Sequence, residues 1–339
     1  MARRRFFQAF AAVVVTVCLL VLSGVLSAQG NSDNAFERVK QVQERHTAKL
    51  MAQKGVVGTA VGLSEGGRPA MLVLLEETGV AGIPAELDGV PVQPIVTGKI
   101  SAMPKPGGKT PHVDGTAVFP RPVPIGVSTG NQGQCSAGTI SCRVKSGNTV
   151  YALSNNHVYA LENEAPIGSQ VLQPGLYDTQ CVYNSDNVIG TLSEFVTIYF
   201  DGSDNTVDAA IAESSTSDLG NATPADGYGT PKSTTATATV NMAVQKYGRT
   251  TDLTKGTVTG ISGIVDVTYS SGTAHFVDQI IVQSKSPFIK PGDSGSLLVT
   301  NPGKNPVGLL FAGNNSGSYA IANPIADVRG AFNVTVDGE

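Results

Sequence analysis

A chain of 339 residues has room for one large domain or two of medium size, and its hydrophobic content of 41% is enough for a sizeable core. Charged residues make up only 15%, so the polar surface must come mostly from Ser, Thr, Asn, Gln and Gly. That composition argues against a disordered chain and favours strands and turns over long helices. We therefore expect a β-rich protein.

The N-terminus has the layout of a secretory signal peptide. Three arginines at positions 3–5 precede an apolar segment that ends in small residues, which places cleavage near Ser27 or Ala28. We assign residues 1–28 to the signal. An uncleaved membrane anchor stays open as the alternative, because the apolar stretch is long for a signal and Leu26 fits the cleavage site poorly.

The net charge limits the partners of the chain. Loss of the three arginines with the signal changes the formal net charge from −4 to −7, because residues 1–28 hold no other charged side chain. An acidic chain is a poor candidate for binding nucleic acid, and no later segment is apolar enough to span a membrane. We expect a monomer that is secreted or periplasmic, with no stable membrane span after signal cleavage.

Three cysteines remain after the signal, an odd number for an oxidising compartment. Cys142 shares one face of a predicted strand with Ile140 and Val144, so it is interpreted as a small buried apolar residue. We therefore prefer a disulfide between Cys135 and Cys181. The sequence does not exclude a link between Cys135 and Cys142.

A small α+β unit is predicted for residues 29–103. Apolar residues recur at helical spacing over 33–54, and the strand-like runs "VVGTAVGL", "AMLVLLEE" and "VPVQPIVTGKISA" follow. Residues 104–128 are dense in Pro and Gly, which blocks helices and central strands and predicts an extended linker.

The rest of the chain, residues 129–339, predicts a separate all-β domain. Short apolar runs such as "VYALSNNHV", "AVQKYG", "HFVDQIIVQ", "SLLVT" and "VGLLFAG" are broken at intervals by Gly, Asn, Asp and Ser. Many short strands with turn signals are typical of a sandwich or a barrel. Only "NPIADVRGAF", near the end, predicts a short helix.

The segment "PGDSGSLL" places Ser294 among glycines just before an apolar run. A serine hydroxyl barely ionises at neutral pH, so a nucleophilic Ser294 needs an imidazole to take its proton and a carboxylate to orient that imidazole. Of the four histidines, only His157 ends an apolar strand at a polar turn of the β-rich domain. Asp208 enters the apolar run "VDAAIA", where a carboxylate needs a partner. Each motif alone is a weak signal, but the order His, Asp, Ser within one β domain makes a catalytic triad a stronger prediction.

These segments resemble those of chymotrypsin-like, or trypsin-fold, serine proteases, particularly the secreted bacterial members. "LSNNHV" is similar to the histidine segment of the periplasmic high-temperature-requirement proteases, "VDAAIA" to the aspartate segment and "PGDSGS" to the serine segment. "CSAGTISCRVKSG" and "KYGRTTDLTKGTVTG" resemble segments of the α-lytic protease group. The resemblance covers residues 129–335 and implies two six-stranded β-barrels with the active site between them.

The resemblance also implies roles for individual residues. His157 is the expected general base, Asp208 its orienting carboxylate and Ser294 the nucleophile. The backbone amides of Gly292 and Ser294 are expected to form the oxyanion hole.

Two further expectations follow from the same resemblance. Arg249 of the "GRTT" segment is expected to bind the buried carboxylate of Asp293. The unit at 29–103 is expected to be a pro-region that inhibits or assists folding, with a permanent accessory domain as the alternative.

The predicted activity is therefore that of a secreted serine endopeptidase, which acts on polypeptides without a metal or other cofactor. Val158, Ser296 and the pair Asn155 and Asn156 depart from the common pattern, although none removes a catalytic group. A catalytically degenerate binding or scaffold protein remains the alternative. Ester hydrolysis would use the same triad, whereas an α/β-hydrolase would place its histidine last and its serine in a Gly-x-Ser-x-Gly turn. No histidine pair has the spacing of metal ligands.

Overall fold

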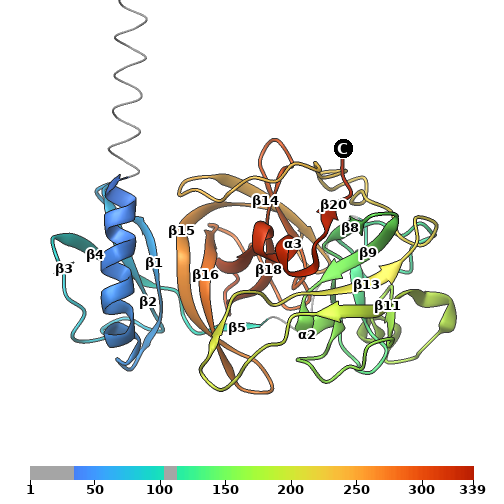
Figure 1. Ribbon diagram of the computed structural model, residues 1–339, viewed down its shortest axis with the longest axis horizontal. Helices are drawn as coiled ribbons and strands as arrows, with labels where there is room; N and C mark the ends of the chain where they lie inside the picture. The colour runs from blue at the N-terminus through green and yellow to red at the C-terminus, as the bar shows by residue number, and fades with distance from the viewer. Residues whose placement is uncertain (1–33, 103–112) are drawn as a thin grey trace, which may run out of the picture.

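The computed structural model describes residues 34–102 and 113–339, and it divides into a small N-terminal unit and a larger β-rich body (Figure 1). The segment assigned to the signal, residues 1–28, lies outside the described residues. We therefore describe the chain from the first helix onward.

The N-terminal unit is one helix packed on a small sheet. The helix covers residues 34–51 and buries Val39, Val42 and Leu50 against the sheet, at the spacing that the sequence predicts. The sheet has the order β1-β2-β4-β3, with β1 and β2 antiparallel and β2 and β4 parallel. Its strands are β1 (Val56–Leu63), β2 (Pro69–Leu75), β3 (Glu86–Leu87) and β4 (Val90–Val96).

The first barrel is a ring of antiparallel strands with the order β20-β8-β9-β13-β11-β10-β6-β7. Because β7 leads within two residues into β8, the two act as halves of one bent strand and close the ring. In β8, Cys142 and Val144 point into the core while Lys145 is exposed, as strand alternation requires. The strands are β6 (Ser128–Asn131), β7 (Gly138–Thr139), β8 (Cys142–Ser146), β9 (Thr149–Ser154), β10 (Gln170–Leu172), β11 (Val188–Phe195), β13 (Ala210–Ser214) and β20 (Thr335–Val336).

The second barrel is closed by hydrogen-bonded pairs throughout, in the cyclic order β14-β15-β16-β19-β18-β17. The helix α3 (Ile325–Phe332) follows its last strand, as predicted. The strands are β14 (Ala243–Gly248), β15 (Asp252–Thr268), β16 (Thr273–Gln283), β17 (Leu297–Thr300), β18 (Pro306–Asn314) and β19 (Tyr319–Pro324), with the short β12 (Asp204–Asn205) beside β16. The structure thus confirms the predicted double β-barrel of the chymotrypsin type behind a small α+β unit.

The N-terminal unit joins the second barrel through β15. Strand β1 pairs antiparallel with β15, with Gly58 opposite Val265 and Thr59 opposite Ile264. A further short strand, β5 (Ile100–Ala102), pairs with both β15 and β18. The two sheets are therefore continuous, and Figure 1 shows the unit standing against the outer side of β15.

The predicted linker at 104–128 ends inside the body of the protein. Val123, Ile125 and Val127 are buried in the core of the first barrel, and the Ile125 amide donates to the Ala222 carbonyl at 3.0 Å. The stretch that contains these residues therefore packs as part of the barrel. Residues 104–112 of the predicted linker lie outside the described residues. The domain boundaries themselves stay predictions.

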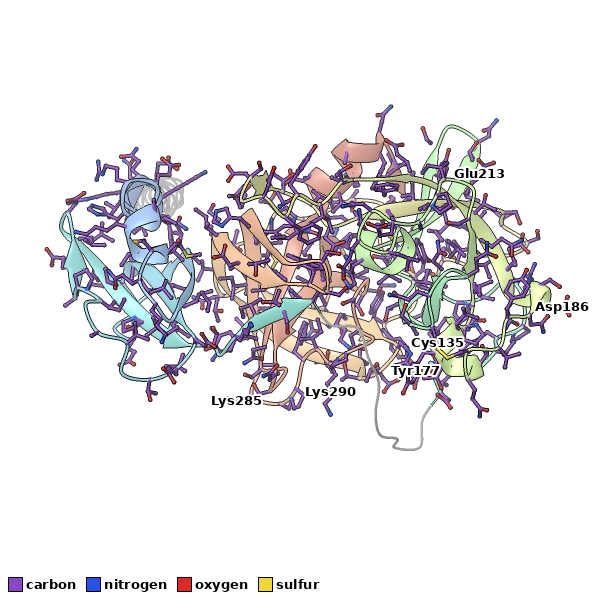
Figure 2. The ribbon with its side chains drawn as sticks, turned by 90° about the horizontal axis from the view of Figure 1, so that it is seen from below. Cys135, Tyr177, Asp186, Glu213, Lys285 and Lys290 are labelled. Atoms are coloured by element: carbon purple, nitrogen blue, oxygen red, sulfur yellow. A yellow bond between two sulfur atoms is a disulfide. The ribbon has the colours of Figure 1, made fainter. Side chains whose placement is uncertain are left out.

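The cysteines pair as preferred. Cys135 and Cys181 form a disulfide, and Cys142 is a free, buried thiol within the described residues. Burial raises the pKa of the Cys142 thiol to about 12. The bridge lies at one edge of the first barrel, where Figure 2 marks Cys135.

Candidate active site

His157 and Asp208 form a buried hydrogen-bonded pair. Strand β9 ends at Ser154, and His157 follows in the four-residue helix α2 (Asn156–Tyr159), while Asp208 lies just before β13. Nδ1 of His157 is 2.6 Å from Oδ2 of Asp208, and the His157 backbone amide donates to Oδ1 of the same carboxylate at 3.2 Å. Both residues are less than a tenth exposed. A carboxylate in this position fixes the tautomer and the orientation of the imidazole.

Asparagines hold the pair in place. Asn155 donates to the Asp208 carbonyl at 2.8 Å, and Asn156 donates to the Val196 carbonyl at 2.6 Å. From the second barrel, Asn323 accepts the Asp208 amide at 3.1 Å. The two asparagines that depart from the common sequence pattern therefore tie the histidine segment to the strands around Asp208.

Tyr269 is a third partner of the Asp208 carboxylate, and the sequence analysis missed it. Its hydroxyl donates to Oδ2 of Asp208 at 2.8 Å, and its ring meets the His157 ring edge-on at a centroid distance of 5.8 Å. Burial, reinforced by the Asp208 charge, raises the pKa of Tyr269 well above its usual value. Tyr269 is therefore a neutral donor. In the sequence, Tyr269 is one tyrosine just before the turn residues "SSG", which identifies no partner.

Ser294 lies in a tight turn before β17. The residues on either side of its Asp293–Ser294 step, Gly292 and Gly295, have φ of +99° and +96°, which L side chains rarely adopt. The Ser294 carbonyl accepts the Thr139 amide at 2.7 Å, and its hydroxyl donates to the Phe311 carbonyl on β18 at 3.2 Å. The serine is thus fixed between the two barrels.

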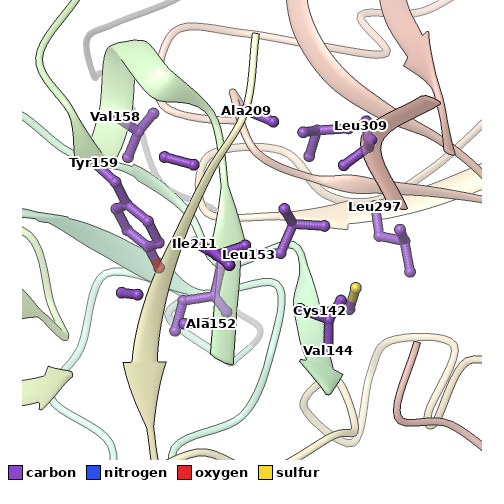
Figure 3. Packing of buried hydrophobic residues seen from close by; sticks show 14 of the residues in the cluster. Cys142, Val144, Ala152, Leu153, Val158, Tyr159, Ala209, Ile211, Leu297 and Leu309 are labelled. Carbon is purple, nitrogen blue, oxygen red and sulfur yellow. The ribbon is translucent and has the colours of Figure 1, made fainter. Parts of the chain in front are cut away.

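Gly138 on β7 brings the serine and histidine segments together. A Cβ at Gly138 would lie 2.5 Å from Val158, the neighbour of His157, and 3.0 Å from the carbonyl oxygen of Ser294. Both segments therefore pack on the same glycine. Figure 3 shows the shared core, in which Val158, Ala209 and Leu297 come from the histidine, aspartate and serine segments in turn.

Within the described residues, the His157 imidazole is hydrogen-bonded through Nδ1 and not through Nε2. Nε2 of His157 is buried and makes no hydrogen bond with any part of the chain that the structure describes. The Ser294 hydroxyl meets Phe311 instead. Transfer of its proton to Nε2 therefore requires the hydroxyl to turn away from that carbonyl, and such bonds commonly tighten only when substrate binds.

The loop that carries Gly292 and Ser294 is rigidly built. A Cβ at Gly292 would lie 2.5 Å from the Thr250 hydroxyl, so no larger residue fits. The Gly292 carbonyl accepts the Thr139 hydroxyl at 2.8 Å, and the Asp293 amide donates to the Lys290 carbonyl at 2.9 Å. The predicted oxyanion-hole amides thus belong to one fixed turn, and their role stays a prediction.

The predicted pair of Arg249 and Asp293 is wrong. Arg249 binds the carboxylate of Asp178 through both Nε and Nη2, with Nε 2.8 Å from Oδ2. The amides of Thr250 and Thr251 donate to Asp293, whereas the Arg249 side chain passes over Gly292 and reaches Asp178. The guanidinium also lies over the ring of Tyr177, 5.8 Å from its centroid, and Figure 2 marks that tyrosine beside Cys135.

Asp293 is held by amides and a lysine. Its carboxylate accepts the backbone amides of Thr250 at 2.9 Å, Thr251 at 3.1 Å and Lys290 at 2.8 Å. Nζ of Lys246 lies 3.5 Å from Oδ1, with both side chains fully buried. Burial lowers the pKa of Lys246, and the Asp293 charge opposes that shift. In the sequence Lys246 is one polar residue inside the strand-like run "AVQKYG", which gives no sign of a buried ion pair.

The large apolar side chains that flank the serine turn in the sequence lie in the protein core. Phe288, Leu309 and Phe311 are fully buried and belong to three different core clusters. Lys285 and Lys290 are exposed, as Figure 2 shows at the end of the second barrel.

Within 34–102 and 113–339, no three His, Cys, Asp or Glu side chains are grouped as a metal site would need. Over the same ranges, no helix is long and apolar enough to cross a membrane.

Among known proteins, no family model and no curated protein matches the chain. Solved structures do resemble it. A serine protease specific for glutamic acid is 22% identical with a TM-score of 0.47, and the match covers 63% of this chain and all of the other. Nocardiopsis protease is 17% identical (TM-score 0.45, covering 63% and 98%), and Thermobifida fusca protease A is 18% identical (0.45, covering 64% and 99%).

Proposed function

We propose that this protein is a serine endopeptidase that hydrolyses peptide bonds through an acyl-enzyme. The observation that carries the proposal is the buried hydrogen bond of 2.6 Å between Nδ1 of His157 and Oδ2 of Asp208, in a site that also contains Ser294. An imidazole oriented by a carboxylate beside a serine in a glycine turn is the arrangement that nucleophilic catalysis requires.

Each residue of the proposed site has its own catalytic role. The Ser294 hydroxyl leaves the Phe311 carbonyl, gives its proton to Nε2 of His157 and attacks the substrate carbonyl carbon. Asp208 stabilises the imidazolium that forms, and His157 then returns the proton to the leaving amine. The amides of Gly292 and Ser294 stabilise the oxyanion. Loss of one such donor typically costs about 3 kcal/mol of transition-state stabilisation.

We also propose that the N-terminal unit, residues 29–103, is an inhibitory pro-region. Strand β5 pairs antiparallel with β18, with Ala102 opposite Ala312 and Ser101 opposite Gly313. Ala312 directly follows Phe311, whose carbonyl contacts the Ser294 hydroxyl. An extended segment paired to the strand beside the nucleophile takes the place of a bound peptide. A permanent accessory domain is the alternative.

Removal of the N-terminal unit tests this role. Active protein from the culture medium should begin after residue 103 when its N-terminus is sequenced. If fully active protein still begins near residue 29, the unit is a permanent domain and the inhibitory role is excluded.

We place the protein outside the cytoplasm, as a secreted or periplasmic monomer. The Cys135–Cys181 disulfide supports this location, since disulfides persist in oxidising compartments. Size-exclusion chromatography with light scattering tests the oligomeric state.

A fluorophosphonate tests the catalytic proposal. The reagent reacts with an activated serine and not with an ordinary one, so it should label the wild-type protein and fail to label Ser294→Ala. A folded wild-type protein that resists labelling would instead support the second candidate, a degenerate binding protein of the same fold. Comparison of a peptide library with simple esters separates endopeptidase from esterase activity.

A further inference from the structure

We propose that Tyr269 is a positioning residue of the catalytic site, which fixes the Asp208 carboxylate in the plane that His157 needs. This inference rests on the proposed function, because it assigns a role within the same triad. Tyr269 itself does not touch the reacting atoms; it acts through Asp208.

The contacts of the carboxylate carry the argument. Oδ1 of Asp208 accepts the backbone amide of His157, while Oδ2 accepts both Nδ1 of His157 and the hydroxyl of Tyr269. The carboxylate is fully buried, so no solvent can replace a missing donor. Within residues 34–102 and 113–339, Tyr269 is the one side chain outside the His157 segment that donates to this carboxylate. It therefore prevents the carboxylate from rotating about its bond to Cβ.

The position of Tyr269 is itself built by other contacts. Tyr269 follows the last residue of β15, and its amide closes the turn to β16 by donating to the Gly272 carbonyl at 2.8 Å. Its ring packs edge-on against Phe200 and stacks on Phe276, with centroid distances of 5.7 Å and 6.2 Å. The hydroxyl therefore has a single direction, toward Asp208.

Glu162 ties this turn to the histidine segment. It lies three residues after helix α2, and its carboxylate accepts the Ser270 hydroxyl at 2.6 Å and the Ser271 amide at 2.8 Å. Burial opposes its charge, but these hydrogen bonds outweigh burial and lower the pKa of Glu162. The turn that carries Tyr269 is thus anchored to the loop that follows His157.

Few charged or titratable groups of the described residues surround Tyr269 and the Asp208 carboxylate. His157, Tyr269 and Asp208 are in direct contact, and Glu162 is the further charge that acts on Tyr269. By donating its hydrogen bond, the Tyr269 hydroxyl stabilises the negative charge on Oδ2 of Asp208. Without it the carboxylate stabilises the imidazolium more strongly, so the neutral base forms only at higher pH.

The test compares Tyr269→Phe with the matched control Tyr247→Phe. Tyr247 is also fully buried and donates to a carboxylate, that of Asp226 at 2.9 Å, away from the triad. For each protein the rate of labelling by a fluorophosphonate is measured between pH 5 and 9. This rate needs no knowledge of the substrate.

We expect Tyr269→Phe to label about tenfold more slowly on the pH plateau, as the loss of a hydrogen bond to a charged group predicts. Its acidic limb should also move to higher pH, an effect that a purely structural role would not produce. Tyr247→Phe should keep the wild-type limb. A Tyr269→Phe profile that matches wild type in both rate and limb overturns the inference.

A second readout does not depend on activity. In the proton NMR spectrum, the far-downfield resonance of the proton between His157 and Asp208 should move in Tyr269→Phe and stay in place in Tyr247→Phe. If the wild-type protein is not labelled at all, the proposed function fails, and this resonance alone decides the role of Tyr269. An unmoved resonance contradicts it.

Discussion

Lys246 and Asp293 form an ion pair across 3.5 Å, with both side chains fully buried beside the serine turn. The Lys246 ammonium also donates to the Asp252 carbonyl at 3.0 Å and to the Thr251 hydroxyl. The charge of Asp293 is therefore balanced by a side chain from within the barrel. The serine turn needs no newly freed N-terminal amine to hold its carboxylate.

The first prediction concerns this pair. Lys246→Met should lower the free energy of unfolding by about 3 to 5 kcal/mol, because it leaves Asp293 charged and buried without a counter-ion. Urea unfolding in a Ser294→Ala background, which prevents self-digestion, measures the loss. Addition of Asp293→Asn should recover part of it, and a double variant with fully additive losses would show that the two residues do not interact.

The second prediction concerns Arg249 and Asp178. Both side chains are almost fully buried, so Arg249→Met should destabilise the protein by about 3 to 5 kcal/mol, and Asp178→Asn should recover part of the loss. Asp293→Asn serves as the control partner. Recovery by Asp293→Asn in place of Asp178→Asn would restore the pairing that the sequence suggested.

The third prediction concerns the free thiol. Since burial raises the pKa of Cys142 to about 12, iodoacetamide at pH 8 should leave the folded protein that starts at residue 29 unmodified. Unfolding without reductant should expose one reactive thiol, and unfolding with reductant three. Mass spectrometry counts the adducts, and rapid modification of the folded protein would contradict the buried position.

The fourth prediction concerns pH and His275. A hydrogen bond of 2.7 Å with Asp266 raises the pKa of His275, against partial desolvation, and Asp204 lies 4.0 Å away. The pair should therefore stabilise the fold fully below the ordinary histidine pKa of about 6.5 and lose that effect as pH rises through the raised value.

Because the pair is partly exposed, the expected contribution is only a few tenths of a kcal/mol. The difference in unfolding free energy between wild type and His275→Gln, measured from pH 5 to pH 8.5, checks the sign. A difference that grows toward high pH would contradict it.

Local patterns were enough to predict most strands. The runs that begin at Val56 and Ala243 match β1 and β14 at both ends, because alternation and turn residues act within a few positions. The pairing of Cys135 with Cys181 followed from Cys142 having an inward place on its strand. Short-range sequence patterns were therefore enough to predict much of the fold.

Contacts between distant segments could not be predicted in this way. Nothing near Tyr269 in the sequence indicates that its hydroxyl meets Asp208, 61 positions away. Arg249 was assigned to the wrong acid because the motif fixes the backbone of its turn and leaves the direction of the side chain to packing. The pairing of β1 with β15 likewise depends on how the N-terminal unit docks on the second barrel.

The proposed function depends on Ser294 acting as a nucleophile that His157 and Asp208 activate. The most direct measurement is mass-spectrometric location of a fluorophosphonate adduct on the wild-type protein and on His157→Ala. We expect one adduct, on Ser294, in the wild type, and none at matched exposure in the folded His157→Ala variant. A folded wild type without an adduct, or equal labelling of Ser294 in the two proteins, would contradict it.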